Sequence, residues 1–183
     1  YLPEESSGLV GQAYRYADEC HVGQMRKSGE PYIAHPLQTA LFLADLHLDT
    51  HTIVAALLHD VVEDCDVSLD EISQRFGPEV SKLVDGVTKL TRMDDKLQPP
   101  IEDATNLMDD AESLHAESLR KMLVSMAEDI RVVLIKLADR LHNMNTLDAL
   151  PPEKRRRIAQ ETLDIYSPLA HRLGIWEIKW RLD

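Results

Sequence analysis

The sequence predicts an all-α protein organised as one domain. Apolar residues recur at helical spacing along most of the chain, capping and breaking residues separate these segments, and no stretch alternates polar and apolar residues like a strand. With 183 residues, 44% of them hydrophobic, the chain can bury a sizeable core and is too apolar to be disordered as a whole. We therefore expect a helical bundle that spans residues 1–183.

Three helices are predicted in the first third of the chain. Residues 7–22 have apolar side chains at helical spacing and stop near Gly23. After loop signals in MRKSGEPYIAHP, residues 36–48 present one apolar helical face. Residues 52–63 are apolar on nearly all sides, which is typical of a helix buried in the core.

A capping box marks the next helix. Ser68, with Glu71 three residues later, predicts a helix start, and Gly77 followed by Pro78 ends that short helix. A further helix should then run to about Leu90.

The second half combines a loop with long helices. Residues 92–105 contain Pro-Pro and many acids and predict a mobile acidic loop, which we hypothesise to be a lid or coupling element. Helices are expected over residues 107–126 and 130–147, and a final pair over residues 153–170 and 175–182.

Charge and composition exclude some classes of partner. The formal net charge of −12 argues against direct nucleic-acid binding, which needs a basic face. Eight acids lie between residues 93 and 118 with Lys96 as the one cation, so much of the excess is local and a small phosphorylated substrate is still compatible. No apolar run is long enough for a membrane span, and the start has no signal-peptide pattern.

Two further features concern the origin of the chain. Cys20 and Cys65 do not form a CxxC pair, and so few thiols favour a reducing, cytoplasmic location. The first residue is Tyr1 rather than Met, so we expect a fragment of a longer protein.

The most informative motif is the pair His59-Asp60 inside the apolar stretch IVAALLHDVVED. An unpaired buried charge costs several kcal/mol, and a metal ion would neutralise this pair. Glu63 and Asp64 follow one helical turn later, where a carboxylate can orient a water or take its proton. The alternative, a core histidine with surface acids at a helix end, suits Glu63 and Asp64 but suits Asp60 badly.

A second constellation lies in the helix predicted over residues 130–147. Asp139, Asn143 and Thr146 form one polar stripe on this otherwise apolar helix. The stripe can supply a metal ligand followed by hydrogen bonds to a sugar or phosphate. An ion pair of Asp139 with Lys136 or Arg140, beside a solvated face, explains it equally well.

The other histidines carry no metal signal of their own. His35 precedes a proline at a helix start and, considered alone, is an ordinary loop histidine. We assign no metal role to the remaining six. His142 is near the polar stripe but rotated from it, and no acid lies at ligand spacing from the other five, which are His21, His47, His51, His115 and His171. HExxH, P-loop and GxGxxG patterns are absent.

Taken together, these residues resemble a known family. The order His35, His59-Asp60, Asp139 is that of the HD superfamily of metal-dependent phosphohydrolases. The strings RKSGEPYIAHP, ALLHDVVED, VDGVTKL, DIRVVLIKLADRLHNM and IYSPLAHRLGIW are similar to the hydrolase domain of the RelA/SpoT alarmone synthetase/hydrolases, over nearly the whole chain. The resemblance implies an HD-domain helical bundle and a Mn²⁺-dependent pyrophosphohydrolase. That enzyme removes the 3′-pyrophosphate of (p)ppGpp, yields GDP or GTP, and so ends the stringent-response signal.

The resemblance also implies roles for particular residues. The metal ligands would be His35, His59, Asp60 and Asp139, and no cysteine matches a ligand position. Glu63 and Asp64 match the acidic pair that activates the attacking water. The positions that match substrate-binding residues are Arg26, Lys27 and Ser28 for the base, where a guanidinium can stack on guanine, and Asn143 and Thr146 for the ribose and phosphates. Without the resemblance, Arg26 and Lys27 would be read as a solvated loop.

Departures from the family pattern are modest. Relatives often have Thr where this chain has Cys65, which should be neutral if it only packs. They often have Arg where this chain has Asn145, and loss of that cation would weaken phosphate contacts. Some relatives lack the histidine-aspartate pair and are inactive hydrolases, whereas this chain retains it. We therefore expect an active hydrolase without the synthetase and regulatory domains of longer relatives.

Two other functions stay open on the sequence. One is an HD phosphohydrolase that acts on another nucleotide, such as a deoxynucleotide. The other is a regulatory nucleotide-binding domain without turnover, against which the intact acidic residues argue.

Overall fold

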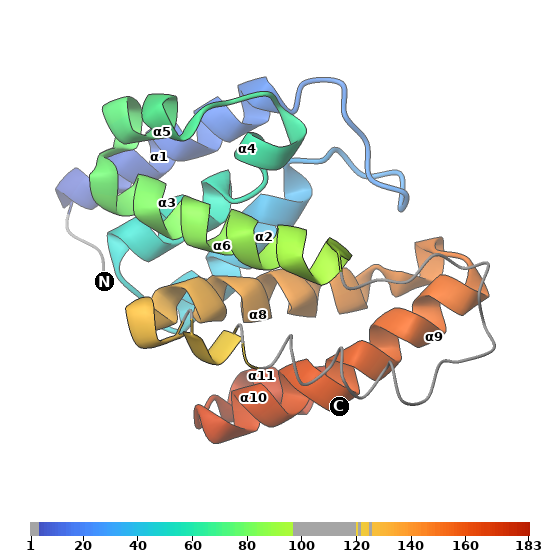
Figure 1. The fold of residues 1–183 in the computed structure, drawn as a ribbon. Helices are drawn as coiled ribbons and strands as arrows, with labels where there is room; N and C mark the ends of the chain where they lie inside the picture. Colours follow the sequence, from blue (N-terminus) through green and yellow to red (C-terminus); the bar gives the residue numbers. More distant parts are fainter. Residues whose placement is uncertain (1–3, 97–119, 121, 125) are drawn as a thin grey trace.

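The computed structural model describes residues 4–96, 120, 122–124 and 126–183, and these residues fold into helices (Figure 1). The named elements are, in chain order, α1 (Glu4–Cys20), α2 (Ala34–Asp45), α3 (Thr50–Leu58), α4 (Val61–Asp64), α5 (Leu69–Phe76), α6 (Pro78–Lys96), α8 (Ile130–Asn145), η1 (Leu147–Ala149), α9 (Pro152–Glu161), η2 (Thr162–Tyr166), α10 (Ser167–Arg172) and α11 (Trp176–Leu182). Among the described residues the one extended pairing is an isolated bridge between Met25 and Pro31. The prediction of an all-α protein is confirmed.

Helix α3 lies at the centre of the core. Its residues from Thr52 to Leu58 are all buried, as expected for a helix that is apolar on every side. Helices α1, α2 and α6 pack around it. Asp49 caps its start, because its carboxylate accepts a hydrogen bond from the Thr52 backbone N–H. The sequence thus places the C-terminal end of α3, with His59, inside the molecule.

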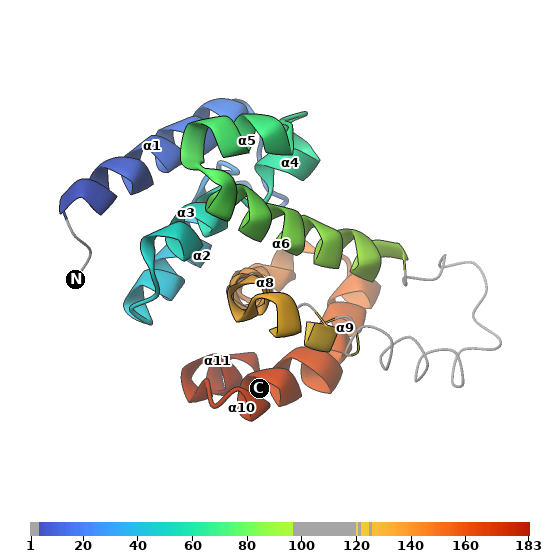
Figure 2. The ribbon, with the colours of Figure 1, turned by 60° about the vertical axis from the view of Figure 1, so that its left-hand side comes forward.

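Helix α8 forms a second buried layer. Figure 2 looks nearly along α8 and shows α2 and α6 on one side and α10 and α11 on the other. Contacts of α8 with α2, α6 and α11 agree with this arrangement. The Asp129 carboxylate caps the start of α8 by accepting the Arg131 backbone N–H. Consequently Asp139 and Asn143, in the second half of α8, come to lie beside α2.

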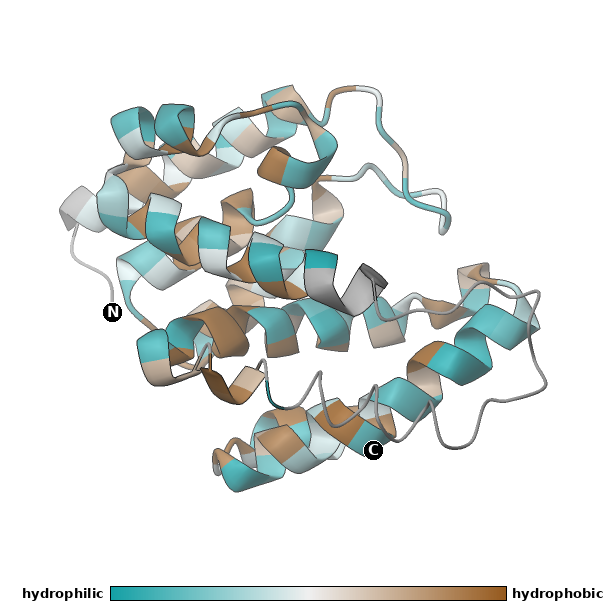
Figure 3. Cartoon of the chain, viewed as in Figure 1, coloured by the Kyte–Doolittle hydropathy of each residue, from teal (hydrophilic) through white to brown (hydrophobic). Residues whose placement is uncertain are grey.

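The C-terminal segment is one long helical run with a change of winding. Helix α9 passes into the π-helix η2, which passes into α10. Figure 3 shows that α9 is largely hydrophilic. Arg140 of α8 reaches η2, where its guanidinium carbon lies 4.0 Å from the centre of the Tyr166 ring, and it forms an ion pair with Glu161 (3.1 Å). These contacts fix α9 at one side of α8.

Two predicted helix boundaries were wrong. The helix expected over residues 52–63 is interrupted at His59-Asp60, between α3 and α4. Helix α6 continues past Leu90 to Lys96, so residues 92–96 of the expected acidic loop are helical. The rest of that loop, and its proposed mobility, lie outside the described residues, as does most of the helix expected over residues 107–126.

The capping box is half formed. Ser68 accepts the Glu71 backbone N–H (3.2 Å), as predicted. The Glu71 side chain does not return to Ser68 and instead accepts the hydroxyl of Tyr16 (2.8 Å) and pairs with Arg75. A residue expected to act within its own helix therefore ties α5 to α1.

Of the helices described here, none combines the length and the apolar character needed to cross a lipid bilayer.

Candidate metal centre and substrate cavity

Four side chains predicted as metal ligands meet at one point. His35 lies in the first turn of α2, His59 and Asp60 lie at the junction of α3 and α4, and Asp139 lies on α8. His35 Nε2 is 3.1 Å from Asp139 Oδ1 and 3.5 Å from Asp60 Oδ2. His59 Nε2 is 3.1 Å from Asp60 Oδ1 and 4.0 Å from Asp139 Oδ1. The structure thus brings together three segments, of which the first and the last are more than a hundred residues apart in the sequence.

The orientation of His59 explains the break in the helix. Its Nδ1–H donates to the Ala56 carbonyl (2.7 Å), the group that would accept the Asp60 N–H in an uninterrupted α-helix. The chain therefore leaves helical geometry at the histidine-aspartate pair. With the proton on Nδ1, the Nε2 lone pair points toward the two carboxylates.

This arrangement suits a divalent cation. His59 Nε2 is buried and makes no hydrogen bond to any described residue, although carboxylate oxygens lie close to it. A lone pair that faces two carboxylates in the interior is repelled by them, and a positive charge between the three groups would remove this repulsion. Ligand atoms of His35, His59 and Asp60 all lie within 4.8 Å of one another, which fits a single ion. Two nitrogens and carboxylate oxygens are a suitable donor set for a first-row divalent metal.

Asp139 takes part in both arrangements that the sequence left open. It faces His35, and its second oxygen accepts a hydrogen bond from Lys136 Nζ (3.1 Å). Asn143 Nδ2 also donates to Asp139 (2.7 Å), while Arg140 pairs elsewhere. Burial alone would raise the pKa of Asp139, but the charge of Lys136 and the contact with the His35 imidazole outweigh burial and hold this pKa well below its ordinary value. Asp139 is therefore an anion fixed in position by its neighbours.

The two acids after the motif differ from each other. Asp64 Oδ2 lies 2.6 Å from the hydroxyl of Tyr32, which is also 3.0 Å from Asp60 Oδ2. Burial and the charge of Asp60 raise the pKa of Tyr32, so this bridge keeps its proton. Glu63 Oε1 is buried and accepts no hydrogen bond from the described residues. Burial, followed by the charge of Asp60, raises the pKa of Glu63 to about 7.

Residues predicted to bind the substrate line the same cavity. The loop that carries Arg26, Lys27 and Ser28 turns back at Gly29, whose φ of +88° favours glycine. Arg26 Nη2 donates to Asn143 Oδ1 (2.7 Å), so this guanidinium is linked to α8.

The predicted hydroxyl ligands also have partners within the protein. The Ser28 hydroxyl donates to Glu30 (3.2 Å), and the Thr146 hydroxyl lies 3.2 Å from the Asn143 carbonyl. Each hydroxyl keeps lone pairs that can accept further hydrogen bonds.

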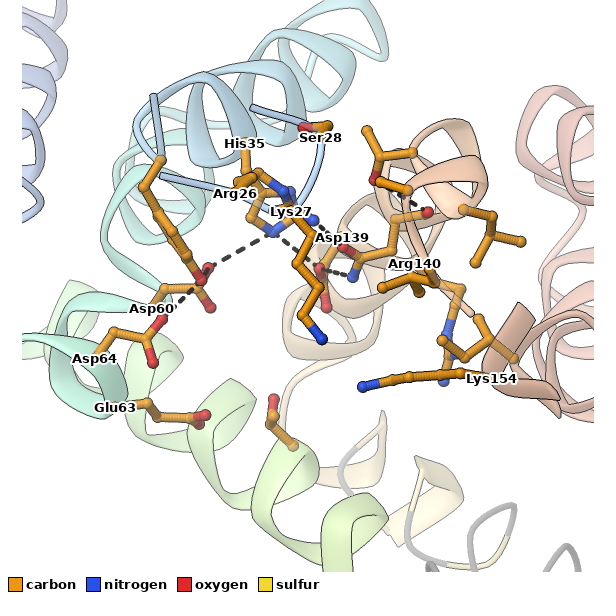
Figure 4. Close-up of a pocket in the computed structure, with 18 of the residues that line it drawn as sticks. Arg26, Lys27, Ser28, His35, Asp60, Glu63, Asp64, Asp139, Arg140 and Lys154 are labelled. Atoms are coloured by element: carbon orange, nitrogen blue, oxygen red, sulfur yellow. Dashed lines mark hydrogen bonds and ion pairs between the residues drawn. The ribbon is translucent and has the colours of Figure 1, made fainter. Parts of the chain in front are cut away.

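The cavity has two chemically different ends. Its volume is about 480 Å³, and every predicted site residue lines it except His59, which is buried behind the others. Figure 4 shows Asp60, Glu63 and Asp64 on one side, with Arg140 and Lys154 on the opposite side. Arg157 of α9 also lines that second side. An acidic, metal-binding end thus faces a basic end.

Sequence analysis missed these basic residues. Lys154 and Arg157 belong to the run KRRR, which is conspicuous in a chain of net charge −12 but follows the last recognised motif. Tyr32 was also missed, although it stands three residues before His35. Only the place of α9 in the fold shows that Lys154 and Arg157 line the same cavity as the metal ligands.

His142 was assigned no metal role, and it does not join the cluster of ligand atoms. However, its Nδ1 lies 2.8 Å from His35 Nδ1. Burial, together with the neighbouring His35 and Arg26, lowers the pKa of His142 to about 4. His142 therefore contacts the ring nitrogen of His35 that is opposite the one facing Asp60 and Asp139.

The two departures from the family pattern have different surroundings. Cys65 Sγ is 3.2 Å from His21 Nδ1, and burial raises the pKa of its thiol to about 11. This thiol contacts the imidazole that stacks on Tyr32, with ring centres 4.4 Å apart. Asn145 is exposed and lines a neighbouring cavity rather than the main one. The weaker phosphate binding expected from the loss of an arginine at this position stays a prediction.

Comparisons with known proteins agree with this geometry. A family model described as "HD domain" matches residues 13–176. The chain is 52% identical over its whole length to "Bifunctional (p)ppGpp synthase/hydrolase SpoT" of Escherichia coli (strain K12), of which it covers 24%. It is also 52% identical over 175 residues to "Probable guanosine-3′,5′-bis(diphosphate) 3′-pyrophosphohydrolase" of Synechocystis sp., covering 96% of this chain and 21% of that protein.

A solved structure extends the comparison to the fold. It is described as a metazoan ortholog of SpoT that hydrolyses ppGpp and plays a role in starvation responses. The TM-score is 0.69 at 27% sequence identity, with 100% of this chain and 94% of the other covered. The resemblance to the RelA/SpoT hydrolase domain is confirmed, and the chain spans about a quarter of the length of the curated relatives it matches.

Proposed function

The chain belongs to the HD domain family, and from this premise we propose that it hydrolyses the 3′-pyrophosphate of (p)ppGpp in a Mn²⁺-dependent reaction. The observation that carries the proposal is a cavity with a candidate metal centre at one end, where Asp139 lies beside the group His35, His59 and Asp60, and with basic residues at the other end. A guanosine with a diphosphate at each of two positions carries anionic groups that can reach both ends. The names of the relatives support this choice over other nucleotides.

The reaction consumes one water. The water oxygen forms a bond to the phosphorus attached to the ribose 3′ oxygen, and the bond from that phosphorus to the 3′ oxygen breaks. The 3′ oxygen leaves with a proton, so ppGpp gives GDP and pppGpp gives GTP, each with pyrophosphate. When bound by His35, His59, Asp60 and Asp139, Mn²⁺ would supply a Lewis acid that polarises a phosphoryl oxygen and lowers the pKa of the attacking water.

We assign the proton transfer to Glu63 rather than to Asp64. A general base needs an accessible lone pair and a pKa near the working pH. The Glu63 side chain lines the cavity, and the pKa of Glu63 is raised to about 7. Asp64 is held by the Tyr32 hydroxyl, so its part is to fix the orientation of that hydroxyl and of Asp60.

The remaining cavity residues would bind and orient the nucleotide. Lys154 and Arg157 can neutralise phosphate charge at the end away from the metal. Arg26, Lys27 and Ser28 would contact the base, with Asn143 and Thr146 at the ribose. The two free cysteines support the proposed cytoplasmic setting, where this nucleotide would be the partner.

Pyrophosphate release tests the proposal directly. The purified chain is incubated with ppGpp and Mn²⁺, with ppGpp and a chelator, and with a panel that includes GTP, ATP and dGTP. We expect pyrophosphate and GDP only from ppGpp with Mn²⁺. Preferred turnover of a deoxynucleotide would favour another HD phosphohydrolase, and nucleotide binding without turnover would favour a regulatory domain.

A further inference from the structure

His142 and His35 form a contact that can hold only one proton. Their Nδ1 atoms are 2.8 Å apart, with ring centres 4.9 Å apart and planes inclined by 48°. At this distance one nitrogen donates an N–H and the other accepts it. The position of this proton decides which tautomer His35 adopts.

The opposite nitrogen of His35 faces the metal centre. Its Nε2 lies 3.1 Å from Asp139 Oδ1 and 3.5 Å from Asp60 Oδ2. An imidazole binds a metal through a bare nitrogen, so Nε2 is available only when the proton is on Nδ1. If His142 were the donor, a neutral His35 would instead present Nε2–H to the carboxylates and exclude a cation.

The tautomer of His59 is fixed by a different kind of partner. Its Nδ1 faces the Ala56 carbonyl, which can only accept, so its tautomer is fixed by the backbone. The partner of His35 is a side chain that can donate or accept. One of the two candidate nitrogen ligands is thus oriented by the main chain, and the other depends on one side chain.

We propose that His142 is a positioning residue for the metal centre: by accepting the Nδ1–H of His35, it holds His35 in the tautomer whose Nε2 can bind the cation. This inference rests on the metal centre of the proposed function and is independent of the nucleotide. A partner of this kind, behind a metal-binding histidine, typically changes metal affinity about 10- to 100-fold when removed. His142 itself does not bind the metal.

The first test measures the tautomer in the wild-type protein. Long-range ¹H–¹⁵N correlation spectra of the metal-free, ¹⁵N-histidine-labelled chain at pH 8 distinguish Nδ1–H from Nε2–H imidazoles. The His35 signals are identified by their absence from His35→Gln. We expect the Nδ1–H form for His35 and for His59. The Nε2–H form for His35 would overturn the proposal.

The second test compares two substitutions at position 142. Asn can place an amide oxygen near the position of Nδ1, whereas Leu offers no acceptor. By calorimetric titration we expect His142→Leu to bind Mn²⁺ about 10- to 100-fold more weakly, and His142→Asn to stay within about threefold of the wild type. His171→Leu, which alters an exposed histidine against Trp176, is the matched control and should leave Mn²⁺ affinity unchanged.

The outcomes separate this inference from the proposed function. Unchanged Mn²⁺ affinity in a folded His142→Leu protein would overturn the positioning role. If circular dichroism shows that this variant does not fold, the wild-type tautomer and the His142→Asn titration decide. Wild-type protein that binds Mn²⁺ but does not hydrolyse ppGpp would contradict the substrate assignment and leave the role of His142 standing.

Discussion

The two ends of the cavity are built in opposite ways. At the metal end, His35, His59 and Asp139 are almost completely buried, and each is held by a hydrogen bond or ion pair within the protein. At the basic end, Lys154 is exposed and forms no ion pair with any residue that the structure describes. The metal end is fixed before a ligand arrives, whereas Lys154 at the basic end is a long side chain that can adjust.

This difference matches the two tasks that the cavity must perform. Chemistry at phosphorus requires ligands held in a fixed geometry, because reorganisation during the reaction would raise the barrier. Charge recognition of phosphates tolerates movement, since the Coulomb interaction changes gradually with distance. We therefore expect substitutions at the metal end to reduce turnover and those at the basic end to reduce affinity.

The largest effect should come from removing a ligand. We expect Asp60→Ala to lose Mn²⁺ binding and to lower turnover by about 10³-fold or more, the size found for principal catalytic groups. Fluorimetric melting checks whether the loss of turnover comes from lost Mn²⁺ binding. At a Mn²⁺ concentration 100 times the Kd, the unfolding free energy of the wild-type protein should increase by about 2.7 kcal/mol, and that of the variant should not change. Asp18→Ala, on the exposed face of α1, is the control. Full activity of Asp60→Ala would refute the assignment.

A smaller loss of turnover should follow from a substitution that removes the general base and retains the metal ligands. We expect Glu63→Gln to lower kcat by about 10²- to 10⁴-fold, the usual contribution of a general base, with Mn²⁺ affinity nearly unchanged. Asp64→Asn is the comparison, because its oxygen can still contact Tyr32. If Asp64→Asn lost more activity than Glu63→Gln, the roles of the two acids would have to be exchanged.

A substitution at the basic end should lower the affinity for the nucleotide and leave turnover unchanged. We expect Lys154→Ala to raise KM by about tenfold at unchanged kcat, which corresponds to about 1.4 kcal/mol of phosphate binding. Added salt should raise the KM of the wild-type protein toward that of the variant, because salt screens the interaction of Lys154 with phosphate. Arg156→Ala, on the same helix but outside the cavity lining, should leave KM unchanged. A fall in kcat for Lys154→Ala would mean that this end takes part in the chemical step.

Partly buried charges remote from the cavity should have the smallest effect. Arg131 pairs with Asp129 (2.7 Å) and Glu79 (2.7 Å) across the starts of α8 and α6. We expect Arg131→Met to cost less than about 1 kcal/mol of unfolding free energy at pH 7, with no change in kcat/KM.

The same pair predicts a pH dependence of stability. The hydrogen bond from Arg131 lowers the pKa of Asp129 below its ordinary value. A lowered carboxyl pKa stabilises the folded state above the unfolded pKa of about 3.9, and this contribution disappears as the pH falls through the folded value. Chemical denaturation at pH 7 and below pH 4 should show the gap between wild type and Arg131→Met closing in acid. A constant gap would contradict this assignment.

Much of the architecture followed from local pattern. The apolar surface of residues 53–58 predicted a buried helix, and the apolar run within residues 130–147 correctly predicted α8. The break at His59 was not predicted, because periodicity carries no information on whether an imidazole will bind the carbonyl three residues earlier. Likewise, nothing in the capping box indicated that Glu71 would contact Tyr16 on another helix.

Some residues of the candidate site were also identified from local sequence alone, and others were not. A histidine-aspartate pair inside an apolar run is unusual in any fold, because such a run is buried and buried charge is costly. Residue types alone therefore identified His59 and Asp60 as candidate site residues. His35 needed the family resemblance, since a histidine before a proline has no distinctive local signal. Their roles as ligands stay predictions that the titrations above will test.

By itself, then, the sequence determined the helical class, the buried α3 and the residues whose chemistry demands a counter-charge, because each depends on neighbours within a few turns. Only the tertiary structure decided that Lys154 faces Glu63 across a cavity, that Tyr32 bridges Asp60 and Asp64, and that His142 lies against His35. Such contacts join residues up to about a hundred positions apart. Their geometry is set by how helices pack around a shared core, which no local pattern specifies.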